Sequence, residues 1–390
     1  PTGKAANRLQ ESLRQGLAHL QTPSLEDHAL RAGCPEAQTL HRLLSYSPST
    51  GRFGHHENHR LPALAVIADE GSMIDLVLMD GLLRALHDDA ILILLGDADQ
   101  LPSVAAGAVF RDLGELAVRL TTNFRTSNAA SAIHPCAAAV RNGDAQALLA
   151  GLAPRERPED LRFEGVELVP EPQRETLLHT WYRDHVTALP DWNDLVRHEY
   201  VLHDQGFSPE DEERLQRLFA HAQRQRVLCV TRERPTGATP SNDLLCSLAD
   251  AKAGLAAGTP VMILRNDYER SLWNGDQGLM IAVQGHARPL AVFRRASEQG
   301  PPWQVVPPET LDDTLGLAYA LTVHKAQGSE YDKVLVLLPE VPLPLLTREL
   351  LYTAMTRSRC SVVICGSPAV LTSALGNTLG RASGLADRIA

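Results

Sequence analysis

The chain is poor in aromatic residues, in paired cysteines and in long apolar runs. Phe, Trp and Tyr make up 5% of the 390 residues, and the six cysteines include no Cys-x-x-Cys spacing. This pattern favours free thiols in a reducing compartment over a zinc site or a disulfide framework. No stretch reaches the ~18 apolar residues of a membrane span, and no charged-then-apolar leader is evident. We therefore expect a cytoplasmic protein without a membrane anchor.

The chain also lacks an excess of basic residues. It has 37 Lys and Arg against 47 Asp and Glu, which gives a net charge of −10. This balance argues against a protein that binds nucleic acid through bulk positive charge. A local basic track is still compatible with it, because charges at physiological salt are screened over about 8 Å. The hydrophobic fraction of 44% and the charged fraction of 22% are those of an ordinary globular protein of two or three domains.

Two recurring ligand patterns are absent as well. The start of the chain, from Pro1 to Ala5, contains a Gly-Lys pair but does not complete the Gly-x-x-x-x-Gly-Lys-Ser/Thr phosphate loop, and no other segment does. His55, His56 and His59 lie close together, but in a polar, glycine-containing stretch without a helix to align them. We therefore do not expect a metal site at these histidines.

What is present is a pair of short apolar runs in residues 63–102, separated by a segment of helical length. Runs of this kind without polar alternation are typical of parallel strands buried on both faces. Because ligands bind at the carboxyl ends of parallel strands, the polar residues that follow the two runs should converge on one crevice. Those residues are Asp69, Glu70, Asp97, Asp99 and Gln100.

This carboxylate pattern is characteristic of a nucleotide-triphosphate motor. An Asp at a strand end can hold Mg²⁺, a neighbouring Glu can deprotonate the attacking water, and a Gln on the next strand can sense the γ-phosphate. A single Asp after an apolar strand is as often structural as functional. The Asp69-Glu70 pair followed by Gly96-Asp97-x-Asp99-Gln100 is far more specific.

The rest of the chain predicts an α/β fold with two RecA-like parallel-sheet motor domains, the first of them N-terminally truncated. We place the first domain at 1–150, the second at 151–257 and 314–390, and a small β-barrel insertion at 258–313, where short β-branched runs alternate with turn residues. Residues 45–62 predict either a protruding β-hairpin or a plain loop. The acidic run at 210–213 predicts a solvated helix start.

Taken in order, the motifs resemble those of superfamily 1 DNA helicases of the 5′-to-3′ branch, and most closely the RecD-type alpha subunits of exodeoxyribonuclease V. The resemblance covers nearly the whole chain. The segments that carry it are residues 1–6, Asp69-Glu70-Gly71-Ser72-Met73, residues 96–101, Asn274-Gly275-Asp276-x-Gly278, residues 322–330 and residues 352–357. One small departure is Gly71, where the family usually has alanine or another small residue, a change that should be harmless.

The resemblance implies a helicase that hydrolyses ATP with Mg²⁺ between the two motor domains and moves along single-stranded DNA. Asp69 would position the metal ion, Glu70 would be the general base and Gln100 would link the γ-phosphate to motion. Arg125 and Arg357 would reach the γ-phosphate as arginine fingers. Gly328 and Glu330 would join Asp69 around the nucleotide.

The resemblance also implies sequence-independent contacts with the DNA backbone and, in the inserted barrel, a grip on the strand. For His324 and Gln327, packing and helix capping are the structural alternatives. The 45–62 segment would split the duplex. The residues assigned to DNA are Thr2, Gly3, Lys4, Thr39, His41, Arg265, Asn266, Asn274, Thr322, His324, Lys325 and Gln327.

Three functions remain open from the sequence. The leading one is the helicase subunit of a RecBCD-type helicase and nuclease in double-strand-break repair and recombination, acting on DNA duplex ends with RecB- and RecC-type subunits. A stand-alone RecD-like helicase or a conjugative relaxase-type helicase is the second, and a non-catalytic DNA-binding or scaffold remnant is the third. Because the family's phosphate loop would lie upstream of Pro1, we expect the chain to be a C-terminal portion that does not turn over ATP efficiently alone.

Overall fold

The computed structural model describes residues 3–33, 36–120, 132–249, 255–267, 269–295 and 302–380. The chain divides between residues 121 and 122 into two compact units, each with its own core. The α/β class predicted from the sequence is confirmed. In the part of the chain that the structure describes, no helix combines the length and the apolarity that crossing a bilayer requires.

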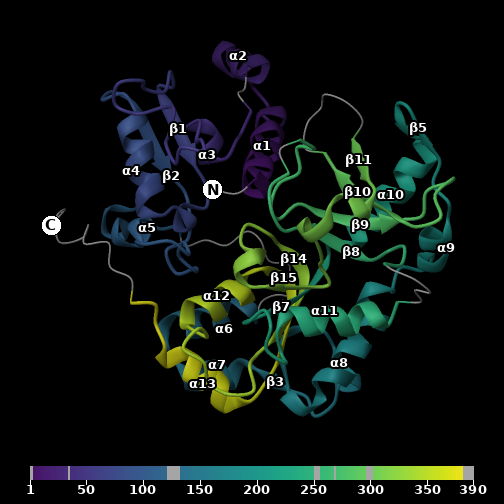
Figure 1. Ribbon diagram of the computed structural model, residues 1–390. Helices are drawn as coiled ribbons and strands as arrows, with labels where there is room; N and C mark the ends of the chain where they lie inside the picture. Colours follow the sequence, from purple (N-terminus) through teal and green to yellow (C-terminus); the bar gives the residue numbers. More distant parts are fainter. Residues whose placement is uncertain are drawn as a thin grey trace. The chain divides into compact units, whose positions relative to one another are not determined.

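The first unit is built on two parallel strands joined by a helix (Figure 1). Strand β1 pairs with β2 in register, with Ala65 opposite Ile91, and α4 forms the connection between them. Asp75 caps α4 by accepting a hydrogen bond from Leu78 N. The elements of this unit are α1 (Gly3–Ala18), α2 (Leu25–Gly33), α3 (Leu40–Leu43), β1 (Ala65–Ala68), α4 (Leu76–Ala85), β2 (Ile91–Leu94) and α5 (Val109–Asp112).

The burial of β1 and β2 differs from the sequence prediction. Val66 and Ala68 pack on the core with Leu78 and Leu82 of α4, but the alternate side chains of both strands face outwards. Ile67 and Ile93 are each more than two-fifths exposed. The prediction that both faces are buried is therefore wrong for this pair, because the described residues of the unit cover only one face.

Residues 45–62 form a loop rather than a regular hairpin. Two isolated antiparallel bridges, Ser47 with Arg52 and His56 with His59, are its only strand-like pairings among the described residues. Phe53 packs on the core of the unit at α4, where a Cβ on Gly81 would lie 2.7 Å from its ring. The histidine rings stabilise the loop itself, since the Nδ1 atoms of His55 and His59 bond to backbone carbonyls.

The second unit contains a six-stranded, fully parallel sheet with the order β13-β7-β14-β15-β4-β3. Its central strands are long apolar runs, and Val334–Leu337 of β14 and Val362–Cys365 of β15 are fully buried. The strands are β3 (Ala153–Pro154), β4 (Gly165–Val169), β7 (Gln225–Cys229), β13 (Ala320–Thr322), β14 (Tyr331–Leu337) and β15 (Ser358–Cys365).

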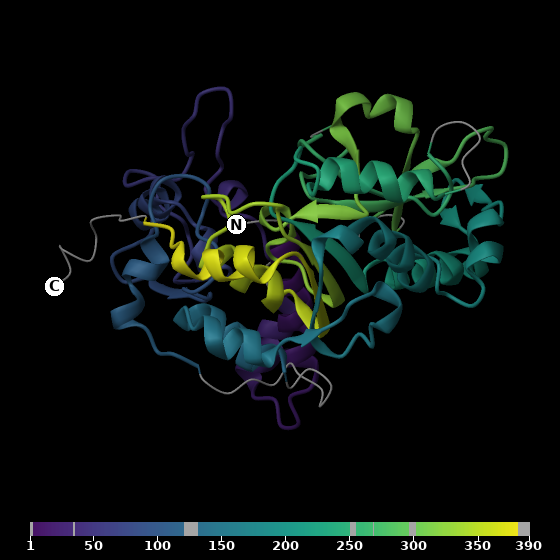
Figure 2. The same ribbon diagram turned by 90° about the horizontal axis from the view of Figure 1, so that it is seen from below.

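Helices cover both faces of this sheet (Figure 2). On one face, α8 and α11 bring Leu178, Trp181 and Leu245 onto the apolar side chains of the strands. On the other, α12 packs on β14 and β15, and α6 packs on α12. The helices are α6 (Ile133–Asn142), α7 (Ala145–Gly151), α8 (Arg174–Trp181), α11 (Ala238–Ser247), α12 (Arg348–Thr356) and α13 (Pro368–Gly376).

This packing places the unit boundary before α6, not at residue 150. Helices α6 and α7 belong to the second unit because they contact α12 and α13. The Ala-rich sequence of α6 allows the close approach, with Cys136 and Val140 buried. The sequence held no signal for this, since an apolar helix face does not specify which sheet it covers.

An antiparallel sheet of five strands is inserted into the second unit, in the order β11-β10-β9-β8-β12. We call it the inserted sheet. Its hydrogen bonding is open, with β11 and β12 at the edges among the described residues, so the expected barrel closure is not seen, and β12 extends past residue 313. Its strands are β8 (Pro260–Ile263), β9 (Gln277–Ile281), β10 (Leu290–Arg294), β11 (Trp303–Val306) and β12 (Leu315–Leu317).

A helical segment assigned from the sequence to the motor domain packs on this inserted sheet instead. Trp192 of α9 (Trp192–Arg197) and Leu215 and Phe219 of α10 (Pro209–Ala222) share one core with Leu279 and Val292 of the inserted sheet. Figure 1 shows α9 and α10 beside β9 and β10. Two separate stretches of the chain therefore build one subdomain.

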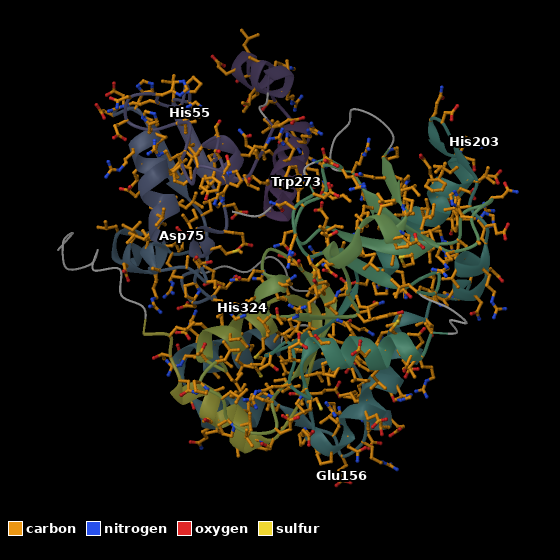
Figure 3. All side chains as sticks on the ribbon, viewed as in Figure 1. His55, Asp75, Glu156, His203, Trp273 and His324 are labelled. Carbon is orange, nitrogen blue, oxygen red and sulfur yellow. The ribbon has the colours of Figure 1, made fainter. Side chains whose placement is uncertain are left out.

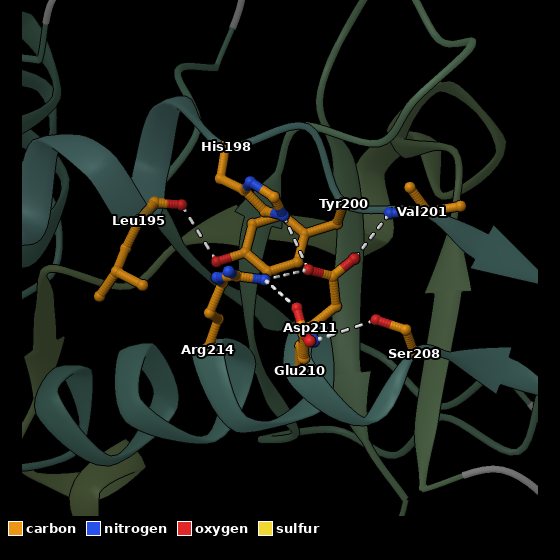
Figure 4. Close-up of polar contacts among 8 residues, drawn as sticks. All are labelled: Leu195, His198, Tyr200, Val201, Ser208, Glu210, Asp211 and Arg214. Carbon is orange, nitrogen blue, oxygen red and sulfur yellow. Dashed lines mark hydrogen bonds and ion pairs between the residues drawn. The ribbon is translucent and has the colours of Figure 1, made fainter.

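Asp211 fastens the start of α10 to the segment before it (Figure 4). Its carboxylate accepts hydrogen bonds from His198 Nε2 at 2.7 Å, Val201 N at 3.0 Å and Arg214 Nη1 at 2.9 Å. Burial alone would raise the pKa of Asp211, but these donors outweigh it and hold that pKa below its ordinary value. The predicted solvated helix start is thus wrong for Asp211, which is buried, and right for Glu210 and Glu213, which are exposed.

Candidate functional site

The carboxyl ends of β1 and β2 bring the predicted carboxylates of the first unit together. Leu95 N bonds to Ala68 O at 2.8 Å, and Gly71 N bonds to Leu95 O at 2.7 Å, so the residues after the two strands run side by side. Glu70 lies between these two bonds with φ of 54°, a left-handed conformation that costs a non-glycine residue about 1–3 kcal/mol. Strained residues of this kind cluster at active sites, ligand clamps and switch regions.

The turn after β2 is organised by Asp97. Its carboxylate accepts hydrogen bonds from Asp99 N at 3.0 Å and from the Gln100 side-chain amide at 3.3 Å. Asp99 in turn forms an ion pair with Arg119 at 2.8 Å. Gln100 is thereby held beside the strand end.

Two glycines permit the close approach of these strand ends. A Cβ on Gly96 would lie 2.9 Å from Gly71 N, and a Cβ on Gly71 would lie 2.5 Å from the Phe110 ring. Gly71 is the position where the resemblance leads one to expect alanine. In this chain an alanine at position 71 would displace the Phe110 ring, so the glycine is what allows Phe110 to pack there.

The carboxylate of Asp69 fits the part of a Mg²⁺ ligand. One of its oxygens accepts Glu70 N at 2.8 Å, and the other has no hydrogen-bond partner among the described residues. No three His, Cys, Asp or Glu side chains gather as a metal cluster in the described ranges. Mg²⁺ in nucleotide sites commonly uses one or two carboxylates, with phosphate and water oxygens as the other ligands.

The other candidate site residues of the first unit give less evidence of a function. Thr39 caps α3 by accepting a hydrogen bond from Arg42 N at 3.3 Å, and the His41 ring packs edge-on against Tyr46. Gly3 begins α1, where a Cβ would meet nothing within 4 Å. Thr2, Arg125 and the Lys4 side chain lie outside the described residues.

In the second unit, the carboxyl ends of β13 and β7 carry the predicted DNA-contacting motif (Figure 3, where His324 is labelled). The two strands pair in register, with Thr322 opposite Cys229. A turn of 3-10 helix, His324–Ala326, follows β13, and Lys325 N bonds to the Thr322 hydroxyl at 3.4 Å. Lys325 is exposed, whereas Gln327 is 8% exposed, in keeping with a packing role for the glutamine.

Asn242, on α11, is a positioning residue that the sequence did not reveal. Its side-chain oxygen accepts Ala320 N at 2.8 Å, and its amide donates to Ala320 O at 2.9 Å and to Leu317 O at 3.3 Å. The side chain thus takes the place of a neighbouring strand at the start of β13. The only sequence signal was a polar residue on the apolar face of a helix.

Arg232 is a second residue that the sequence reasoning missed. It lies in the loop after β7, and its side chain is mostly exposed beside Glu233. Partial burial, and then the positive charge of Arg232, lower the pKa of Lys325. Lys325 and Arg232 therefore lie close together at the carboxyl ends of β13 and β7. A bound phosphate would offset the repulsion between their positive charges.

Arg357 and Glu330 are both held inside the second unit. Arg357 is 3% exposed, and its Nη1 donates to Ser329 O at 3.3 Å. Glu330 forms an ion pair with Arg359 at 2.6 Å. Gly328 has φ of 70°, a conformation that favours glycine and turns the chain into β14.

Arg265, Asn266 and Asn274 lie on the ribbon between β8 and β9. All three are exposed. Asn266 Oδ1 accepts Asn274 N at 2.8 Å, which joins the two strands of the ribbon. This places all three predicted contacts of the insertion on one surface element.

Comparisons with known proteins add family evidence to this geometry. A model described as an AAA domain matches residues 1–106, and one described as a UvrD-like helicase C-terminal domain matches residues 317–365. RecBCD enzyme subunit RecD of Mycolicibacterium smegmatis is 35% identical over 398 residues, covering 100% of this chain and 65% of that protein. The chain belongs to the RecD-type family of superfamily 1 helicases.

Other relatives of this RecD-type chain extend the comparison. ATP-dependent RecD2 DNA helicase of Deinococcus radiodurans is 30% identical, covering 94% of this chain and 42% of that protein. Among solved structures, Pif1 helicase from Bacteroides in complex with ADP-AlF3 and ssDNA has a TM-score of 0.44 at 17% identity, covering 92% of this chain and 86% of that one. The chain spans 63–65% of the length of the mycobacterial RecD relatives.

Proposed function

We propose that this chain carries motor elements of an ATP-dependent 5′-to-3′ DNA helicase subunit, working with RecB- and RecC-type subunits on DNA duplex ends in double-strand-break repair and recombination in the cytoplasm. The observation that carries the proposal is the convergence of Asp69, Glu70, Asp97 and Gln100 at the carboxyl ends of β1 and β2. The names of the RecD relatives support the assembly.

Each carboxylate has a distinct part in this proposal. When bound, MgATP supplies the phosphoryl group that is transferred to water. Asp69 would hold the metal ion through the oxygen that does not bond to Glu70 N. Gly328 and Glu330 remain proposed nucleotide-binding residues. Glu70 accepts the proton of the attacking water, and Gln100 orients towards the γ-phosphate. Arg125 and Arg357 are the proposed arginine fingers, whose charge would stabilise the negative charge that develops on the γ-phosphate.

Single-stranded DNA would bind at the carboxyl ends of β13 and β7. Thr322, His324 and Lys325 present hydroxyl, imidazole and ammonium groups, which suit contact with phosphate and sugar irrespective of sequence. Arg232 adds positive charge beside Lys325. Such a site explains how a protein of net charge −10 could hold a polyanion.

The first test is a Glu70→Gln substitution, assayed by DNA-stimulated ATP hydrolysis of the complete protein. Loss of the general base should lower kcat by roughly 100-fold or more, with KM for ATP little changed. Glu26→Gln is a matched control, because Glu26 is an exposed carboxylate of α2 in the same unit, and no role in binding or catalysis is assigned to it. Full DNA-stimulated turnover by Glu70→Gln would contradict the proposed role.

A second assay separates the complex-bound reading from a stand-alone helicase, the alternative favoured by the likeness to RecD2. Tagged protein is purified from its native cells, and unwinding is measured on a duplex with a 5′ overhang. Co-purification of two large subunits supports the RecBCD-type assignment. A single purified chain that unwinds the duplex at full rate supports the stand-alone one.

A further inference from the structure

The ribbon between β8 and β9 extends beyond the named ends of these two strands. At the end of the ladder Gly275 N bonds to Ile263 O at 2.8 Å and Ile263 N bonds to Asp276 O at 2.9 Å, so two residues oppose one in a bulge. Beyond it, an isolated antiparallel bridge joins Asp267 to Leu272. We call residues 264–267 and 269–276 the ribbon tip. Gln304 of β11 donates to Arg270 O at 2.7 Å, which ties the tip to the inserted sheet.

Trp273 has a fixed backbone at the ribbon tip. Its N–H donates to Asp276 Oδ2 at 2.7 Å, and its carbonyl accepts Asp276 N at 2.9 Å. The preceding Leu272 is 2% exposed in the core of the inserted sheet. Trp273 is not among the buried residues of that core.

The exposure of Trp273 sets it apart from the other tryptophans. Trp181, Trp192 and Trp303 are 1%, 9% and 4% exposed, so each is accounted for by core packing. Trp273 is the fourth of four, and it keeps solvent-accessible surface (labelled in Figure 3). Of the four tryptophans, Trp273 alone is not buried.

The surroundings of Trp273 suit a nucleic-acid strand. Arg265 is exposed and forms no ion pair among the described residues, and Asn266 and Asn274 are exposed amides. The acids of the tip are already engaged, since Asp267 pairs with Arg270 at 2.7 Å and Asp276 accepts Trp273 N. An aromatic face beside an open cation is how sequence-independent proteins hold single strands, because every base presents a π-face.

We propose that Trp273 is a stacking platform for an unpaired base of single-stranded DNA, with Arg265 holding a neighbouring phosphate. The inference rests on the proposed DNA-binding function and adds to it a residue that contacts bases rather than backbone. Stacking gives the inserted sheet a hold that does not depend on salt, unlike the phosphate contacts at the edge of β13.

The test uses intrinsic tryptophan fluorescence and two ligands of equal length, an oligothymidylate and an oligomer of abasic deoxyribose phosphate. The parent protein should show quenching with the oligothymidylate and little with the abasic strand. Trp273→Leu should weaken oligothymidylate binding by roughly 5- to 100-fold and leave abasic binding unchanged. Trp273→Phe should abolish the quenching while keeping most of the affinity, because a smaller ring can still stack.

Trp303→Phe is the matched control, since Trp303 of the inserted sheet is buried against Phe219 of α10 and its indole nitrogen has no hydrogen-bond partner among the described residues. It should leave both quenching and affinity as in the parent. Quenching that persists in Trp273→Phe, or equal losses for both ligands in Trp273→Leu, would overturn the stacking role. A parent protein that binds neither ligand would sink the proposed DNA-binding function, and this inference with it.

Discussion

The two parallel sheets of this chain read alike in sequence and differ in burial. Strands β1 and β14 are both short apolar runs that lead into polar residues. In β14, Val334–Leu337 are fully buried between helices, whereas in β1 every second residue is exposed. The difference teaches that an apolar run specifies a strand locally, but its burial depends on which elements lie against each face.

The largest expected effect on stability comes from placing a carboxylate on one strand of each parallel sheet. Val336→Asp introduces a carboxylate at a 0% exposed site of β14 and should cost more than about 4 kcal/mol, enough to unfold the second unit. Ile93→Asp, at a 43% exposed site of β2, should cost less than about 1 kcal/mol. Hydrogen exchange resolved by unit measures both. Equal losses would mean that the open face of β1 and β2 is covered in solution.

The buried core of the second unit also predicts that the stability of this unit depends on pH. His185 is 7% exposed against Phe163 and Trp181, and burial, then the charge of Lys333, lower its pKa to about 4. The folded protein therefore binds fewer protons than the unfolded chain between pH 6.5 and 4. Stability from the neutral ring is complete above the unfolded pKa of about 6.5 and is lost as the pH falls towards 4, by up to about 3 kcal/mol.

His185→Phe keeps a ring in place and removes the titration. Its free energy of unfolding, measured by urea titration of the second unit, should vary less between pH 4 and 7 than that of the parent. An unchanged pH profile would show that His185 is hydrated or paired in solution. The matched control is His179→Phe on α8, a histidine of the same unit outside the buried core.

The smallest effect should be the same in both units. Asp75 caps α4 and Thr347 caps α12, each accepting a backbone hydrogen bond three residues on. Replacing either by alanine should cost about 1 kcal/mol. Thermal unfolding followed by circular dichroism would check this. A much larger loss at Thr347 would show that capping energies, too, depend on how complete the surrounding core is.

Features set by neighbouring residues were predictable from the sequence. The strand runs follow from local patterns, and Asp69 and Asp97 closely follow β1 and β2 in the sequence. Features set by distant partners were not. The sequence did not show that α10 packs on the inserted sheet, that Asp211 is buried, or that Asn242 holds the start of β13. Each depends on a contact whose other half is far along the chain.

Strand β15 shows that a contact between distant segments also depends on the order in which the chain is synthesised. It lies in the middle of the six-stranded sheet, between β14 and β4, and pairs Ser361 with Gly165. The ribosome therefore synthesises β4 long before β15, and the sheet is complete only when β15 has been made. Pairings of such separation are slow to form. A premature stop shortly before residue 358 would split the sheet at its centre, leaving β4 and β3 with no strand to join.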